Sequence, residues 1–138
     1  MADASAAEVT KGDGYAVANL ADLGEGPGFR KIRTPLGVTA FGVNGIVLPP
    51  AYETGSHLHE EQEELYFLHS GEIEIEFGDG STHKLEPGGL AWVDAPTVRK
   101  VRNTSETEEA VYVVVGGKDG YVGRDGKTPD DESEPLGT

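Results

Sequence analysis

Two histidines one residue apart, with a carboxylate five residues later, are the residues of this sequence whose types and spacing suit metal chemistry. The segment "GSHLHEEQEELYFLHSG" (55–71) contains His57, His59 and Glu64. Imidazole nitrogens and a carboxylate oxygen can hold Fe(II), Mn, Ni or Zn, and two histidines with one carboxylate leave coordination positions open for substrate or oxygen. An open position matters because a fully ligated metal cannot act as a Lewis acid on another molecule. The alternative interpretation is a polar sheet edge followed by a solvated acidic loop.

The local structure around these residues decides whether they can meet. In a β-strand, successive side chains point to opposite faces, so His57 and His59 share a face and lie about 7 Å apart along the backbone. In the next segment, Glu64 and Tyr66 share one face, and the residues between and after them take the other. A metal site therefore requires that the faces carrying the histidines and Glu64 both turn into one interior.

The middle of the chain predicts β-structure. Twenty glycines and eight prolines separate short segments rich in Val, Ile, Tyr and Phe. In "EIEIEF" (72–77), apolar and acidic residues alternate, which indicates one buried and one solvated face, and "GDGS" after it suits a hairpin turn. No window shows a helical period, so we expect an all-β sandwich or barrel. The expected strands are Val38–Leu48, His57–His59, Glu64–His69, Glu72–Phe77, Thr82–Leu85, Leu90–Val93, Val98–Asn103 and Ala110–Gly116.

Length and composition restrict the class of protein. The 138 residues predict one domain at 13–123, with a loose N-terminal tail at 1–12 and an acidic C-terminal tail at 124–138. A net charge of −14 argues against partnership with nucleic acid or anionic membranes, and no apolar run is long enough to span a bilayer. The absence of cysteine excludes disulfides and thiolate sites. With no signal pattern at the N-terminus, we expect a cytoplasmic location.

The sequence resembles the cupins in two motifs. Gly55, His57, His59, Glu64 and Gly71 are similar to the first cupin motif, and "PGGLAWVDAPTVRKVRN" (87–103) is similar to the second. The resemblance, to small single-domain cupins of the conserved-barrel type, implies a jelly-roll β-barrel (a double-stranded β-helix). It also implies a metal and a small-molecule ligand in the interior, and a homodimer. It does not specify the activity, because this fold carries many functions.

The second motif departs from the family at one position. Where cupins have a third histidine, four residues before the motif's Asn103, this chain has Arg99, which stays protonated and has no lone pair for a metal. Three alternatives remain open. The metal is held by His57, His59 and Glu64 while Arg99 binds an anionic group of the substrate; or Arg99 replaces the ion through a bidentate pair with Glu64; or another donor, His83 or Tyr66, completes the site.

Other residues of the sequence are expected in the pocket, in the core or on the outer surface. Tyr66, on the Glu64 face, is a candidate to line the pocket and bind substrate, or else to pack in the barrel core. Trp92 is expected in the core or at the pocket rim, with a stacking contact to substrate as the alternative. His69 has the opposite parity to Glu64 and is expected outside. In "VRKVR" (98–102), Lys100 and Arg102 are expected to face outward and pair with the acidic row of the neighbouring strand.

The sequence is compatible with three functions. The first is a metal-dependent enzyme, of oxygenase, isomerase or lyase type, on a small polar and anionic molecule, with no catalytic residue identified beyond the metal ligands. The second is a non-catalytic protein that binds or senses a small molecule, with the Arg99–Glu64 pair in place of the metal. The third is an interaction module, which inward ionisable groups disfavour because they are costly to bury.

Overall fold

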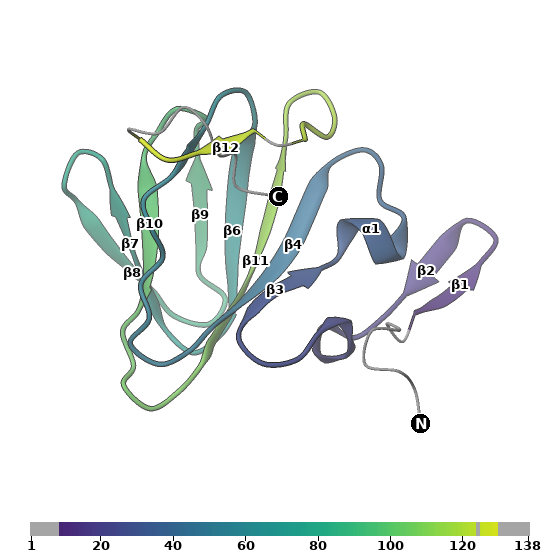
Figure 1. Cartoon of the computed structure of the whole chain (residues 1–138), viewed down its shortest axis with the longest axis horizontal. Coiled ribbons are helices and arrows are strands. Elements are labelled where there is room, and N and C mark those ends of the chain that lie inside the picture. Colours follow the sequence, from purple (N-terminus) through teal and green to yellow (C-terminus); the bar gives the residue numbers. More distant parts are fainter. Residues whose placement is uncertain (1–8, 124, 130–138) are drawn as a thin grey trace.

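Two antiparallel sheets packed face to face form the body of the protein, seen here in a computed structural model that describes residues 9–123 and 125–129 (Figure 1). The larger sheet has the strand order β3 (Gly28–Lys31), β4 (Gly42–Leu48), β11 (Ala110–Gly117), β6 (Glu63–Ser70) and β9 (Leu90–Val93). The facing sheet has the order β10 (Arg99–Asn103), β7 (Ile73–Phe77) and β8 (Thr82–Leu85). The all-β jelly roll expected from the sequence is confirmed.

A further strand pair lies beside the smaller sheet. β5 (Leu58–His59) pairs with β12 (Gly126–Lys127), which crosses one end of the sandwich (Figure 1). Isolated antiparallel bridges, Glu53 to Arg102 and His57 to Arg99, join the segment before and including β5 to β10. The segment 125–129, within the range predicted as the C-terminal tail, thus contributes a strand to the end of the sandwich.

The N-terminal part adds smaller elements that sequence analysis did not predict. β1 (Thr10–Gly12) and β2 (Tyr15–Val17) form a hairpin that projects from the body, followed by the 3-10 helix η1 (Leu20–Leu23) and the short helix α1 (Arg33–Leu36) (Figure 1). Residues 1–8 and 130–138 of the two predicted tails, with residue 124, lie outside the described residues. Among the helices described, none has the length and apolar character needed to cross a membrane.

Period-two alternation produces the core as predicted. On β7, Ile73 and Ile75 are fully buried while the glutamates between and after them reach solvent. The outward basic residues of β10 pair with this acidic row, because Arg102 lies 3.2 Å from Glu74 and the Lys100 amine lies 3.9 Å from Glu76. The apolar core comprises inward residues of both sheets: Ile46, Leu48, Tyr66, Leu68, Ile73, Ile75, Val93, Val101, Ala110, Tyr112 and Val114.

Candidate metal centre

Backbone pairing between β5 and the smaller sheet positions the two histidines. The amide of His57 donates to the carbonyl of Arg99 and the amide of Arg99 donates to that of His57, both at 2.9 Å, and the amide of His59 donates to Ala95 at 2.9 Å. Because alternate side chains share a face, both imidazoles turn into the space between the sheets. His59 is only 1% exposed.

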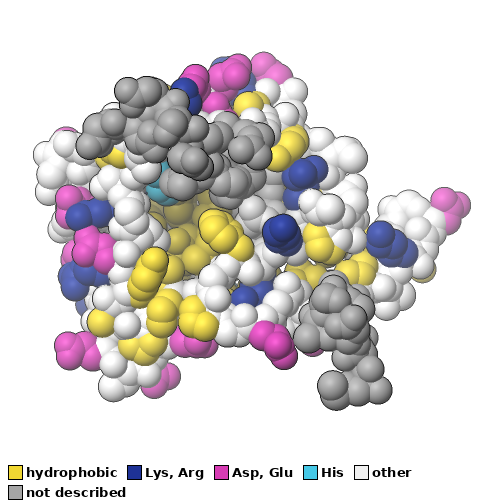
Figure 2. All heavy atoms as spheres, in the orientation of Figure 1, with side chains coloured by type: hydrophobic (Ala, Val, Ile, Leu, Met, Phe, Trp, Pro, Cys, Tyr) yellow, Lys and Arg dark blue, Asp and Glu magenta, His cyan; other side chains and the backbone are white. Residues whose placement is uncertain are grey.

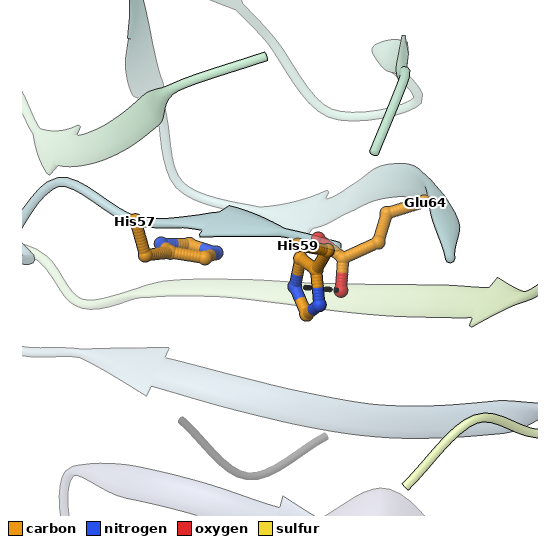
Figure 3. Close-up of side chains that lie close together, drawn as sticks. All are labelled: His57, His59 and Glu64. Carbon is orange, nitrogen blue, oxygen red and sulfur yellow. Dashed lines mark ion pairs between the residues drawn. The ribbon is translucent and has the colours of Figure 1, made fainter. Parts of the chain in front are cut away.

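Glu64 reaches the same place from the larger sheet. The ligand atoms of His57, His59 and Glu64 all lie within 4.8 Å of one another, and Nε2 of His59 lies 3.1 Å from Oε2 of Glu64 (Figure 3). The two imidazole rings have centroids 5.5 Å apart and stand nearly perpendicular, at 80°. The convergence of these three side chains in the interior, on which the sequence-based hypothesis depended, is therefore present.

The two nitrogens of His59 have different surroundings. Nδ1 lies 3.2 Å from the side-chain amide nitrogen of Gln62 and 3.7 Å from Oδ2 of Asp125. Nε2 is buried and close to Glu64, but it has no hydrogen-bond partner in good geometry among the described residues. A buried polar atom without such a partner is uncommon and calls for an explanation. A cation between His59 and Glu64 supplies one.

The two oxygens of Glu64 are also divided between two environments. Oε1 accepts a hydrogen bond from the Tyr66 hydroxyl at 2.9 Å and lies 3.7 Å from the Arg99 guanidinium. Oε2 faces the imidazole of His59 and accepts a hydrogen bond from the side-chain amide of Gln62 at 3.4 Å. Burial acts to raise the pKa of Glu64, but the contact with His59 and the charge of Arg99 together bring it below its ordinary value. Glu64 is therefore held as a carboxylate with Oε2 on the histidine side.

His57 is kept neutral by its surroundings. Burial, with the charge of Arg99 as the next cause, lowers the pKa of His57 from 6.5 to about 4, against the opposing effect of Glu64. At neutral pH the imidazole therefore has a lone pair available, which is the form that binds a metal.

Arg99 lies behind the cluster and not on a ligand-accessible wall. Its side chain is 0% exposed, and its guanidinium donates to the carbonyls of Asp94, at 3.2 Å, and Ala95, at 3.4 Å. Its contact with Glu64 is a single one of 3.7 Å, so the bidentate pair considered from the sequence is not formed. The guanidinium is also absent from the lining of the cavity described below, which argues against a direct contact with substrate.

Asp125 is the residue of this site that sequence analysis missed. Its Oδ2 accepts hydrogen bonds from the backbone amides of Glu61, at 2.9 Å, and Gln62, at 2.8 Å, and lies 3.7 Å from Nδ1 of His59. The carboxylate is buried, although it lies in the range 124–138 that the sequence predicts as an acidic C-terminal tail. No local pattern could have identified it, because its partners lie more than 60 positions earlier in the chain.

The remaining candidates occupy different places. Tyr66 is buried and lines the cavity, with its hydroxyl bonded to Glu64, so it orients the carboxylate. Trp92 is 61% exposed and donates its indole N–H to Glu63, which corrects the expectation of a core or pocket-rim position. It lies on the outer face of the larger sheet because its cross-strand partner, Leu65, has the parity opposite to Glu64. His69 and His83 are both exposed, so the first is outside as predicted and the second completes no metal site.

A cavity of about 510 Å³ opens beside the three candidate ligands. Figure 2 shows its hollow, with an apolar floor and a histidine at the margin. Strands β3, β4 and β11 contribute much of its apolar wall, and the lining residues are Pro27, Gly28, Phe29, Ile46, Val47, Leu48, Pro49, Tyr52, Thr54, Gly55, His57, His59, Glu64, Tyr66, Tyr112, Val114 and Thr128. This volume is in the range typical of sites for small molecules.

The three side chains fit a divalent metal. Bonds of about 2.1 Å place neighbouring ligand atoms about 3.0 Å apart at a right angle, which the 3.1 Å separation of His59 and Glu64 already matches. The charges also fit, since the carboxylates of Glu64 and Asp125 and the guanidinium of Arg99 leave one net negative charge (−2 + 1 = −1). Among the described residues the set has three protein donors and lies beside a cavity, which leaves coordination positions for another molecule.

Comparison with protein families gives a match over the region that contains this site. The family model described as "Cupin domain" matches residues 46–116, about half of the chain. A search of curated proteins found no match.

Solved structures with a similar fold agree with this match. A double-stranded β-helix protein from Klebsiella pneumoniae has 25% identity and a TM-score of 0.54, with 58% of this chain and 69% of that chain covered. A sugar phosphate isomerase of the cupin superfamily from Silicibacter pomeroyi has 27% identity and a TM-score of 0.59, with coverage of 65% and 58%. The DMSP lyase DddQ from Ruegeria pomeroyi has 18% identity and a TM-score of 0.57, with coverage of 69% and 46%, and shows similarity of fold alone. The match therefore spans less than two thirds of the isomerase and of the lyase.

Proposed function

Because this chain belongs to the cupin family, we propose that it is a metal-dependent enzyme that acts on a small molecule in the cavity beside His57, His59 and Glu64. The observation that carries the proposal is Nε2 of His59, a buried ring nitrogen that lies 3.1 Å from a carboxylate oxygen and forms no well-directed hydrogen bond with any described residue. The ion would be Fe(II), Mn, Ni or Zn.

The residues around the three ligands support this proposal by holding them in position. Tyr66 donates to Oε1 of Glu64, and the Arg99 guanidinium faces the same oxygen, so Oε2 remains on the side of His59. Burial raises the pKa of Tyr66 well above its ordinary value, so its hydroxyl keeps the proton that it donates. Asp125 faces Nδ1 of His59 with a carboxylate oxygen at 3.7 Å, which favours the proton on Nδ1 and leaves the lone pair on Nε2. Such contacts behind metal ligands orient them and adjust their basicity.

The reaction class we propose is that of an oxygenase, isomerase or lyase. A bound divalent ion supplies a Lewis acid that polarises an oxygen of the substrate. His57, neutral at pH 7, and Glu64, ionised, would each offer a lone pair to the ion, and the apolar wall of the cavity lies beside them. The printed name of one similar structure, a sugar phosphate isomerase, is compatible with this class.

Metal analysis of protein purified without chelators tests the proposal. We expect about one transition-metal ion per chain, a melting temperature that EDTA lowers and added metal restores, and loss of both properties in His57→Ala and Glu64→Gln. The matched control is His83→Ala, which removes an exposed histidine on β8 away from the site. Less than about a tenth of an equivalent after reconstitution with each of the four metals would contradict the proposal and favour a non-catalytic binding protein.

We also propose that two copies associate through the outer face of the larger sheet. On this face Leu65 and Phe67 of β6 lie across from Trp92 and Leu90 of β9, and their exposed fractions run from 41% to 61%. Phe41, 42% exposed, lines a shallow hollow together with Leu65 and Trp92. Side chains of this size leave roughly 400–500 Å² of apolar surface on each copy, so two copies reach the approximately 1,000 Å² of a specific interface.

Light scattering after size exclusion tests the dimer. We expect a dimeric mass for the wild type and a monomeric mass for Leu90→Glu, because the substitution buries a carboxylate in an apolar interface. His83→Glu, on the exposed face of β8 in the other sheet, is the matched control and is expected to remain dimeric. A monomeric wild type at high protein concentration would contradict this interface.

A further inference from the structure

From the cavity wall we infer that the molecule bound beside the metal ligands has an uncharged, apolar body, such as an aromatic ring or a branched hydrocarbon, and carries its oxygen atoms at one end. The inference rests on the proposed function, because the oxygen-bearing end is placed at His57, His59 and Glu64. It replaces the anionic substrate expected from Arg99, whose guanidinium does not line the cavity.

The distribution of polar groups around the cavity carries the first step. The ionisable ligands lie together, whereas the inner faces of β4 and β11 present Ile46, Leu48 and Val114. No lysine or arginine is found among the described residues that line the cavity. A charged body placed against this wall would lose its hydration without gaining an opposite charge, which is strongly unfavourable.

Five residues of the wall carry hydroxyl groups, all of them neutral: Tyr52, Thr54, Tyr66, Tyr112 and Thr128. Those of Tyr66 and Thr54 are already hydrogen-bonded within the protein. The Tyr66 hydroxyl already donates to Glu64 at 2.9 Å. The Thr54 hydroxyl donates to the carbonyl of Gly55 at 3.1 Å and accepts from the amide of Val101 at 2.9 Å. Thr128 differs, because its buried Oγ1 has no hydrogen-bond partner within the part of the chain that the structure describes. It offers the ligand one neutral hydrogen bond, which orients a molecule but does not compensate a charge.

Phe29 supplies the clearest sign of an apolar partner. Phe29 lines the cavity from β3 and yet remains 57% exposed, so the described residues leave more than half of its surface uncovered. A flat apolar body inside the cavity would cover this ring and remove apolar surface from water, which is the main source of binding energy for such ligands.

Two probes with the same metal-binding end and different bodies test the inference. Acetohydroxamic acid and benzohydroxamic acid share a chelating group, and their dissociation constants for the Zn²⁺-loaded protein can be compared by isothermal titration calorimetry. We expect benzohydroxamic acid to bind at least about tenfold more tightly, because the phenyl ring buries more apolar surface than a methyl group. A phenyl probe with a para carboxylate is expected to lose this advantage.

A pair of matched variants assigns the effect to the cavity wall. Phe29→Ser is expected to reduce the advantage of benzohydroxamic acid at least about threefold without changing the affinity for acetohydroxamic acid. Tyr15→Ser makes a comparable aromatic-to-serine change at a residue that is 62% exposed on β2 and does not line the cavity, and is expected to leave both affinities unchanged. Equal binding of the two hydroxamates, or tighter binding of the carboxylated probe, would overturn the inference while the metal site stands.

A probe that needs no metal separates this inference from the proposed function. If the chain binds no Zn²⁺, benzyl alcohol is titrated into the chelator-treated protein. Binding that Phe29→Ser weakens and Tyr15→Ser does not would support an apolar ligand site even though the metal proposal had failed. Absence of binding, or binding that both substitutions affect equally, would overturn the apolar site as well.

Discussion

Replacing Asp125 tests how the end of the chain supports the site. In Asp125→Ala, the amides of Glu61 and Gln62 lose the carboxylate oxygen that accepts from them at 2.9 and 2.8 Å. A buried donor left without a partner costs about 1–3 kcal/mol. The Gln62 amide should cost the full amount because its hydrogen bond is buried. The Glu61 amide should cost less, because its hydrogen bond is only partly buried and water can replace the carboxylate there. We therefore expect the free energy of unfolding to fall by about 2–4 kcal/mol.

Asp125→Asn separates the hydrogen bonds from the charge. Its remaining side-chain oxygen can still accept from both amides, so we expect a loss of stability below about 1 kcal/mol. The charge facing Nδ1 of His59 is removed in both variants. Affinity for Zn²⁺ should therefore decrease in both by about 10–100-fold, the usual effect of changing a residue that supports a metal ligand.

Urea unfolding of the chelator-treated proteins and calorimetric titration with Zn²⁺ measure the two effects. Glu60→Gln is the matched control, since Glu60 is in the same loop, is half exposed and pairs with Lys127 at the surface. It should change stability by less than about 1 kcal/mol and leave metal affinity unaltered. If Asp125→Ala stayed within about 0.5 kcal/mol of the wild type, Asp125 would not hold the turn at 61–62. Unchanged Zn²⁺ affinity in both variants would refute its role behind His59.

Three further changes follow from the structure. The pKa of His57 is about 4 in the folded chain against an ordinary 6.5, so between these values the unfolded chain binds more protons. The metal-free protein should therefore lose at most about 3 kcal/mol as pH falls from about 6.5 to 4, and His57→Asn should flatten this dependence in urea unfolding at several pH values. Tyr66→Phe removes the donor at 2.9 Å from buried Glu64 and should lower the free energy of unfolding by about 1–3 kcal/mol; no loss would mean that the hydroxyl does not support the carboxylate. Gly71→Ala should lower the melting temperature more than Gly80→Ala. Both glycines have a positive φ, of 82° and 88°, so the backbone strain is similar. A Cβ at Gly71 would lie 2.6 Å from a backbone oxygen, whereas one at Gly80 would meet nothing within 4 Å. Equal melting temperatures for these two variants would contradict that steric argument.

Local pattern was sufficient for most of the sheet structure. The predicted strands Thr82–Leu85 and Leu90–Val93 coincide with β8 and β9, and the other predicted strands overlap observed ones, with differences at their ends. The largest difference between a predicted and an observed strand is at Val38–Leu48, where only Gly42–Leu48 forms β4. The N-terminal hairpin and β3 were missed because short exposed strands carry little apolar alternation, so that only their pairing partners define them.

The candidate metal ligands could be found from the sequence because their geometry is mostly local. His57, His59 and Glu64 lie within eight positions, and the parity of two strands decides which way they point. The role of Arg99 could not be decided in the same way. Strand parity places it inward correctly, but whether its long side chain reaches the cavity depends on the carbonyls of Asp94 and Ala95, which hold it behind Glu64.

The sequence by itself determined the fold class, the inward direction of the three candidate ligands and the outward direction of the basic residues of β10, since alternation along a strand is a property of neighbouring residues. Only the tertiary structure decided that Asp125 stands behind His59, that Trp92 lies outside and that the cavity wall is apolar. These features arise from contacts between segments far apart in the chain. Such contacts depend on how the two sheets pack and where the end of the chain crosses them, and no periodicity of the sequence encodes either.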